Sequence, residues 1–161
     1  MRKVLLPLVL VAFAALAVAR LASGVRRYAI AEHSMQPALG AGDWVLARPV
    51  AGSLQRGDIV IFGHPRRPAF ELIKRVIGLP GERVTISGGA VEIDGRSLDR
   101  WAAGTTLPDG SWDLGPDELF VLGDNRALSA ADSRELGPIP EGAAGWKLWC
   151  RYRPLPINRS L

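Results

Sequence analysis

Hydrophobic residues follow two different patterns, one near the amino terminus and another over the rest of the chain. Residues 4–19 contain no charged or strongly polar side chain, and Met1-Arg2-Lys3 precedes them. As a helix this stretch would span about 24 Å, short of the roughly 30 Å hydrocarbon core of a bilayer. If it continues past Arg20 to Val25, it reaches about 33 Å. The pattern predicts a transmembrane helix that remains as an uncleaved signal anchor and ends at Arg26-Arg27.

A cleaved signal peptide is the alternative for this stretch. Ala17-Val18-Ala19 has the small-residue pattern of a cleavage site. The flanking charges do not decide the orientation, because Arg2, Lys3 and the terminal amine oppose three arginines at the far end. The charges alone therefore leave open the side of the membrane on which the following domain lies.

Beyond residue 28 the apolar residues occur in short runs that are rich in β-branched and aromatic side chains. Gly, Pro and Asp separate these runs, and no second amphipathic helix is indicated. The runs predicted to be strands are 44–47, 58–62, 70–77, 84–86, 91–93, 118–122 and 146–152. Turn signals at Gly88-Gly89 and Asp94-Gly95 predict a β-meander over 83–98. With a loop-like stretch that follows, residues 83–116 are expected to form a small lobe inserted into an all-β domain.

One of these runs, residues 70–77, has a lysine on an otherwise apolar face. Alternate residues of a strand share a face, so Phe70, Leu72, Lys74 and Val76 would point the same way. Burial disfavours a charged ammonium and can lower a lysine pKa to about 7–8, where the neutral amine acts as a base. A lysine that extends to solvent at a sheet edge is the alternative interpretation.

The composition makes this lysine more notable. Only Lys3, Lys74 and Lys147 are lysines among the 20 basic residues, and an arginine at position 74 could not lose its proton. A serine in the run before Pro37, Ser34, would be a suitable partner, since a proline stiffens the turn that follows it. Serine with a neutral lysine makes a nucleophile–base dyad.

Charge and composition weigh against several other functions. The formal net charge is +4 and the pI is near 9.8, but the arginines are scattered among acidic residues, so we expect no nucleic-acid partner. Such a basic surface suits anionic lipid headgroups better. Cys150 is the only cysteine, which excludes an intramolecular disulfide. With only His33 and His64 beside it, no metal site and no cofactor are expected.

Four sequence blocks in a fixed order carry a resemblance to a known family. The blocks begin with Ser34-Met35-Gln36-Pro37, Arg56-Gly57-Asp58, Leu72-Ile73-Lys74-Arg75 and Gly123-Asp124-Asn125-Arg126. Together they resemble bacterial type I signal peptidases (leader peptidases), which are membrane-anchored serine proteases with a Ser-Lys dyad. The resemblance covers the predicted anchor and residues 30–154. It implies a catalytic domain of two antiparallel sheets.

The resemblance also implies a role for each matched residue. Ser34 would be the nucleophile and Lys74 the general base, with the Ser34 backbone N–H as one donor of the oxyanion hole. Ser129 would orient the lysine amine. The residues implied as structural support are Asp124 and Asn125, in a turn below the dyad, and Asp132 and Arg134, as an ion pair.

Two of the departures from the family pattern bear on the site. Glu32 stands two places before Ser34, where the family has Ser or Gly and a serine can complete the oxyanion hole. A carboxylate would repel the developing oxyanion, so we expect Glu32 to point away, which leaves the second donor open. Ala130-Ala131 puts two residues, not one, between Ser129 and the next aspartate. Ser133 or water are therefore alternatives for orienting the lysine.

The implied function is removal of signal peptides from exported preproteins. Residues 1–27 would be the cytoplasmic start and anchor of a single-pass, monomeric membrane protein, and 28–161 its extracytoplasmic catalytic domain. The alternatives are a relative dedicated to one client, a self-cleaving repressor-type protease and a catalytically silent peptide-binding domain. A histidine-based triad is disfavoured, because His33 would face away from Ser34 and His64 lies in a separate loop.

Overall fold

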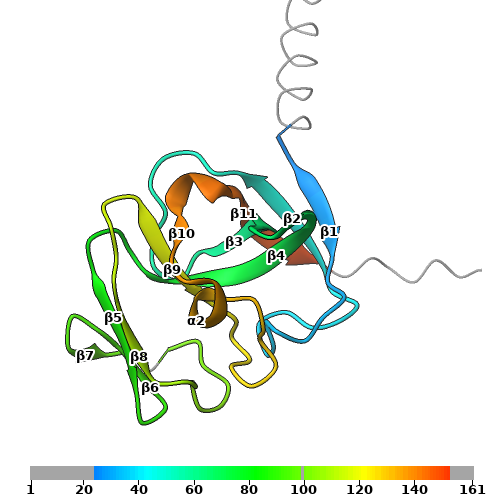
Figure 1. Ribbon diagram of the computed structural model, residues 1–161. Coiled ribbons are helices and arrows are strands. Elements are labelled where there is room, and N and C mark those ends of the chain that lie inside the picture. Colours follow the sequence, from blue (N-terminus) through cyan, green and yellow to red (C-terminus); the bar gives the residue numbers. More distant parts are fainter. Residues whose placement is uncertain (1–23, 99, 153–161) are drawn as a thin grey trace, which may run out of the picture.

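Two antiparallel sheets make up the computed structural model, which describes residues 24–98 and 100–152 (Figure 1). The larger sheet has the spatial order β1 (Arg26–Ala29), β2 (Trp44–Pro49), β11 (Ala144–Tyr152), β3 (Ile59–His64), β4 (Arg67–Gly78), β9 (Glu118–Leu122) and β10 (Ile139–Pro140). The smaller sheet has the order β7 (Arg96–Ser97), β6 (Ala90–Ile93), β5 (Arg83–Ser87) and β8 (Gly110–Asp113). A short helix, α2 (Ser133–Leu136), and a 3₁₀ turn, Glu141–Ala143, follow β9.

The prediction of an all-β domain with two antiparallel sheets is confirmed, and each run predicted to be a strand overlaps one. β8 lies in a stretch that was expected to be a loop. Apart from Trp112, its residues (Gly, Ser and Asp) have low strand propensity, and pairing with β5 at the edge of the small sheet holds them extended. β1 was also not predicted: Arg26 and Arg27, expected to end the anchor, pair with β2.

The predicted anchor otherwise lies outside the described residues. Within 24–98 and 100–152 no helix is long and apolar enough to cross a membrane. The division of the chain after residue 27 into an anchor and a catalytic domain therefore stays a prediction.

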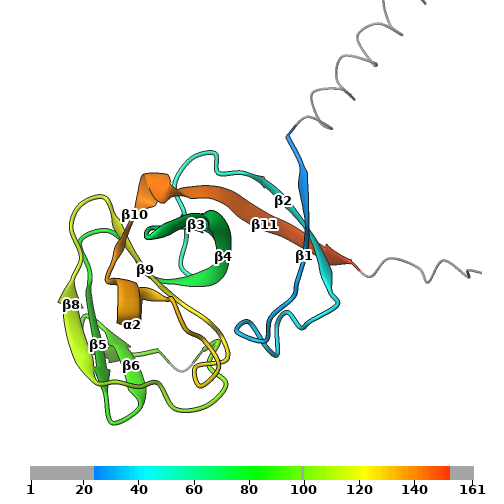
Figure 2. The ribbon, with the colours of Figure 1, turned by 45° about the vertical axis from the view of Figure 1, so that its right-hand side comes forward.

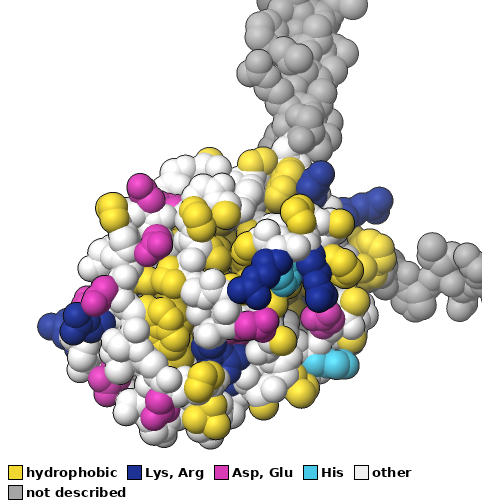
Figure 3. Space-filling model, viewed as in Figure 1, with side chains coloured by type: hydrophobic (Ala, Val, Ile, Leu, Met, Phe, Trp, Pro, Cys, Tyr) yellow, Lys and Arg dark blue, Asp and Glu magenta, His cyan; other side chains and the backbone are white. Residues whose placement is uncertain are grey.

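The small sheet packs against one end of the large one (Figure 2). Val84, Ile86 and Val91 of the small sheet are buried in one apolar cluster with Ile77 of β4 and Phe120 of β9. A separate cluster lies under the loop between β1 and β2 at the opposite end of the large sheet. On the face shown in Figure 3, basic and acidic side chains are interspersed with apolar ones.

The pairing of β4 leaves one of its edges open. Residues 67–75 of β4 pair with β3, but pairing with β9 begins only at Arg75. The preceding residues of β4 therefore have no second neighbouring strand among the described residues. Within the described part of the chain, β1 likewise pairs only with β2. Unpaired backbone groups on such edges can bind another extended chain.

Candidate active site

Ser34 lies in the loop that connects β1 to β2. The loop is held by backbone hydrogen bonds from Ile30 N–H to the Asp43 carbonyl and from Leu39 N–H to the Met35 carbonyl, each 2.8 Å long. Met35 and Leu39 are buried in the apolar cluster under the loop. Ser34 is 8% exposed, and no acceptor for its backbone N–H is found among the described residues. An oxyanion hole requires a backbone N–H without a partner in the protein, so this arrangement is compatible with the role expected of Ser34 N–H, which stays a prediction.

Lys74 lies on β4, opposite Val60 of β3. Its side chain is 2% exposed, so the alternative of a lysine that extends to solvent is wrong. No hydrogen bond or ion pair of its amine is found within residues 24–98 and 100–152. Burial lowers the pKa of Lys74, Asp132 and Glu32 partly oppose this effect, and Arg134 adds to the lowering. The amine is therefore neutral at a lower pH than that of an exposed lysine.

Ser34 and Lys74 line the same pocket, which has a volume of about 180 Å³. One wall comes from residues 29–32, 34 and 35 and the other from residues 70–74, and most of the lining side chains are apolar. Pockets for drug-sized ligands are larger, about 300–1,000 Å³, so this one suits small side chains. Ser129 lines a separate hollow of about 730 Å³, to which neither Ser34 nor Lys74 contributes.

The segment after β9 contacts Ser34 from the other side. Asn125 N–H donates to the Ser34 carbonyl at 3.0 Å. A Cβ on Gly123 would lie 2.6 Å from that carbonyl oxygen and 2.2 Å from Ser129 Oγ. Only glycine allows so close an approach, so Gly123 and Asn125 together fix Ser34 against β9.

Asp132 is the centre of a buried hydrogen-bonded group beside this contact. Ser129 Oγ donates to Asp132 Oδ2 at 2.7 Å, and Arg134 donates to both carboxylate oxygens at 2.9 Å. Burial raises the pKa of Asp132, but the hydrogen bonds from Arg134 and Ser129 outweigh burial and hold it below its ordinary value. Arg134 also donates to the carbonyls of Leu107 and Arg126, so this ion pair joins three segments.

The two candidate serines have different surroundings. The extra residue before Asp132 is accommodated at Ala131, whose φ of 52° is left-handed. Ser133 Oγ accepts a hydrogen bond from Val121 N–H of β9 at 2.8 Å. Ser129 instead lies at Gly123, next to the Ser34 carbonyl. No hydrogen bond from Lys74 to either serine is found among the described residues, so the orienting role of Ser129 stays a prediction.

Sequence reasoning did not anticipate the partner of Asp124. Arg75 follows Lys74 on β4 and donates through Nε and Nη2 to both oxygens of Asp124, at 2.7 and 2.5 Å. It also donates to the Gly57 carbonyl at 2.7 Å and lies over the Trp101 ring. This buried pair connects β4 to the turn that holds Ser34. The sequence offered only one indication of the Arg75–Asp124 pair, which was an arginine directly after Lys74.

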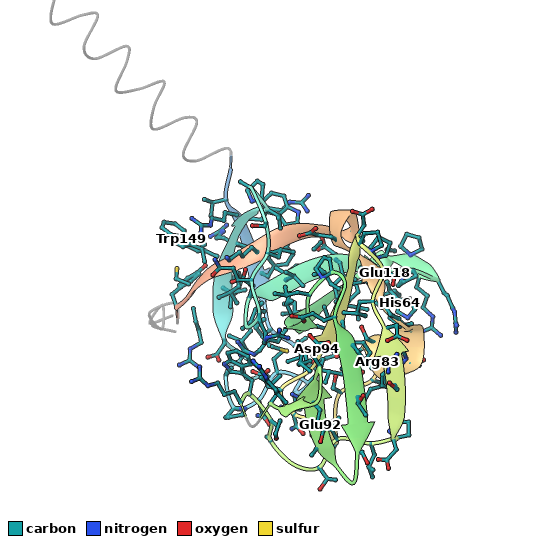
Figure 4. The ribbon with its side chains drawn as sticks, turned by 90° about the vertical axis from the view of Figure 1, so that its left-hand side faces the viewer. His64, Arg83, Glu92, Asp94, Glu118 and Trp149 are labelled. Atoms are coloured by element: carbon teal, nitrogen blue, oxygen red, sulfur yellow. The ribbon has the colours of Figure 1, made fainter. Side chains whose placement is uncertain are left out.

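Glu32 and the histidines lie around the edge of the site. Glu32 lines the same pocket as Lys74, and its charge partly opposes the lowering of the Lys74 pKa by burial. Its expected orientation away from the oxyanion stays a prediction. His33 is exposed, and His64 lies at the end of β3, where its Nδ1 accepts a hydrogen bond from Arg66 N–H (Figure 4). Neither histidine lines the pocket of Ser34 and Lys74.

Comparison with known proteins identifies the family to which the chain belongs. The family described as signal peptidase, peptidase S26, matches residues 1–145. The chain belongs to this family of serine proteases. The resemblance to type I signal peptidases that the sequence blocks indicated is thereby confirmed.

Individual relatives are similar over most of the chain. Signal peptidase I of Leptolyngbya laminosa is 35% identical over 164 residues, which is 86% of this chain and 75% of that protein. Signal peptidase I of Bacillus caldolyticus is 30% identical over 146 residues, or 79% of each. The crystal structure of a signal peptidase I from Enterococcus faecalis has a TM-score of 0.51 at 30% identity, over 58% of this chain and 95% of that chain.

Proposed function

We propose that this chain removes signal peptides from exported preproteins with a dyad of Ser34 and Lys74. The observation that supports the proposal most directly is the pocket shared by the two residues. It combines a serine whose backbone N–H has no acceptor in the described part of the chain with a buried lysine of lowered pKa. A serine nucleophile requires a neutral base beside it, and burial favours the neutral form of the Lys74 amine.

In the proposed reaction Lys74 takes the proton of Ser34 as Oγ attacks the peptide carbonyl. The Ser34 N–H donates to the oxyanion, and the Lys74 ammonium then protonates the leaving amine. Neutral again, Lys74 activates a water molecule that hydrolyses the acyl-enzyme. Because the Ser129 hydroxyl already donates to Asp132 at 2.7 Å, its oxygen is left to accept from the Lys74 amine and orient it.

The substrate would bind as an extended peptide between the open edges of β1 and β4. The pocket lies between these two segments, and their unpaired backbone groups can hydrogen-bond to an added strand. Its volume of about 180 Å³ and its apolar lining favour small side chains next to the scissile bond. This matches the small residues that precede the cleavage sites of signal peptides.

We further propose that residues 1–27 hold the domain at the outer face of the cytoplasmic membrane as a single-pass anchor. Arg26 and Arg27 are exposed where the described chain begins, and Trp149 of β11 is 57% exposed (Figure 4). Arginine and tryptophan are favourable at a lipid interface. Fractionation tests the anchor: the full-length chain should require detergent for extraction, and a soluble product beginning at Arg20 would support the cleaved alternative.

The proposed activity is tested by incubating the detergent-solubilised full chain with several preproteins and mapping the cut by mass spectrometry. Cleavage after small residues is expected in several preproteins, and none with the Ser34→Ala variant. Cleavage of a single preprotein would favour a dedicated maturation protease. No cleavage of any would favour a silent peptide-binding domain.

Activity should rise with pH along a limb that lies below the ordinary lysine pKa of about 10.4. Only the neutral amine is a base, and burial lowers the pKa of Lys74, so the active form is reached at a lower pH. The measurement is kcat/KM against pH. His33→Ala and His64→Ala should leave the limb in place, and loss of activity together with the limb in either variant would favour a histidine base.

Ser129→Ala should slow cleavage about 2- to 13-fold, because one hydrogen bond that orients Lys74, about 0.5–1.5 kcal/mol, is lost. Ser133→Ala removes the acceptor of Val121 N–H and should lower thermal stability more than it lowers kcat. Parallel kinetics and melting curves separate the two effects. A Ser129→Ala enzyme with the wild-type rate would contradict the assignment of Ser129.

A further inference from the structure

Glu32 is a charged residue of the pocket that the proposed mechanism does not use. It is exposed, and no ion pair or hydrogen bond of its carboxylate is found among the described residues. The pocket's other carboxylate, Glu71, is different: it accepts from Tyr28 Oη at 3.3 Å and pairs with Arg26 at 3.5 Å. Glu32 therefore brings an uncompensated negative charge to the pocket that holds Lys74.

We propose that Glu32 is a positioning residue that stabilises the protonated form of Lys74 and so sets the pH range in which the dyad works. The inference rests on the proposed function. In each catalytic cycle Lys74 gains a proton while its side chain is buried, and a nearby negative charge offsets part of the cost of burying that ammonium.

The charges around Lys74 identify Glu32 as the one best suited to this role. They come from three segments: Glu32 from the loop after β1, Asp132 and Arg134 from the start of α2, and Glu71 and Arg75 from β4. Asp132 is neutralised by two hydrogen bonds from Arg134, and Arg75 is bound to Asp124. Asp132 and Glu32 both raise the pKa of Lys74 against the effect of burial. Of these two carboxylates, only Glu32 lacks a cationic partner in the described part of the chain.

Glu32→Gln should therefore move the Lys74 titration and the activity limb to lower pH, by about 0.3–1 unit. The sign follows from the charge: without the carboxylate the ammonium is less stable, so the amine becomes neutral sooner as pH rises. Below the limb the variant should cleave about 2- to 10-fold faster than wild type. Above the limb it should be no faster, because its base is weaker.

The titration can be measured without any substrate. The chain has three lysines, so full-length protein labelled with ¹³C at lysine Cε gives few NMR signals, and the one absent from Lys74→Met belongs to Lys74. Its midpoint is compared in wild type, Glu32→Gln, Glu32→Asp and Glu71→Gln. We expect a lower midpoint in Glu32→Gln, one close to wild type in Glu32→Asp, and no change in Glu71→Gln. High salt should reduce the difference in Lys74 midpoint between wild type and Glu32→Gln, since Glu32 is exposed and salt screens its charge.

The two readouts separate this inference from the proposed function. If the Lys74 midpoint moves as expected but no variant cleaves any preprotein, the proposed function fails and the effect of Glu32 on Lys74 stands. If wild type cleaves and Glu32→Gln titrates like wild type, the inference is wrong. An equal shift of the Lys74 midpoint in Glu71→Gln would also overturn the inference, because any carboxylate in the pocket would then have the same effect as Glu32.

Discussion

Ser34→Ala and Lys74→Ala are each expected to lower the rate of preprotein cleavage by roughly 10⁴- to 10⁶-fold. Ser34 and Lys74 act as one unit, so the double variant should be no slower than either single variant. Lys74→Arg should be equally inactive, because a guanidinium stays protonated at any working pH. The measurement is the single-turnover cleavage rate in detergent, with circular dichroism to check that each variant is folded.

Lys147→Ala is the matched control for the lysine substitutions. Lys147 lies on β11, away from the pocket, and pairs with Asp58 at 2.7 Å. Its loss should leave the cleavage rate close to wild type. An active Lys74→Arg enzyme would contradict the assignment of Lys74 as the base, and an active Ser34→Ala enzyme would exclude Ser34 as the nucleophile.

Asp124→Ala is expected to destabilise the domain by about 3–5 kcal/mol, because it leaves the Arg75 guanidinium buried without its partner. The side chains of Arg75 and Asp124 are only 9% and 3% exposed, and two hydrogen bonds join them. For a domain of this size, the melting temperature should fall by about 6–20 °C. The turn that holds Ser34 should also loosen. The kcat of the variant should therefore be lower than that of wild type even at temperatures well below its melting temperature.

The chain contains a matched control for this pair on its surface. Arg83, labelled in Figure 4, donates through Nε and Nη2 to both oxygens of Asp113, but the two side chains are 62% and 71% exposed. Asp113→Ala should therefore melt within error of wild type, since solvent screens an exposed pair. Equal shifts in melting temperature for the two variants would contradict the role given to burial.

Sequence patterns predicted those parts of the fold where local preference and burial agree. The runs in β3 and β9 are mostly apolar and bounded by turn residues, and together with the second half of β4 they form the buried part of the large sheet. β1 and β8 are polar edge strands whose extended form comes from backbone pairing with a neighbour. A local pattern has no information about such a neighbour, so these two strands were not predictable.

In the candidate site, too, local patterns predicted some features, while others depend on residues far away in the sequence. The alternation of residues along β4 was enough to predict a buried Lys74, because a strand has a fixed period of two. The burial of Arg75 was not predictable, since it depends on Asp124, which is 49 positions away in the sequence. The position of Glu32 in the pocket depends on how the loop after β1 packs against β4, which only the folded structure gives.

The position of β11 in the large sheet has a consequence for how the enzyme is made. β11 is the last strand of the described chain, yet it lies between β2 and β3 and pairs with both. Until it is in place, the β1–β2 hairpin with Ser34 has no strand that joins it to the strand of Lys74. A nascent chain that ends before Ala144 therefore contains both dyad residues without the sheet that brings them together. Pairing between strands so far apart in the sequence is slow to form, so proteolytic activity should await synthesis and pairing of β11.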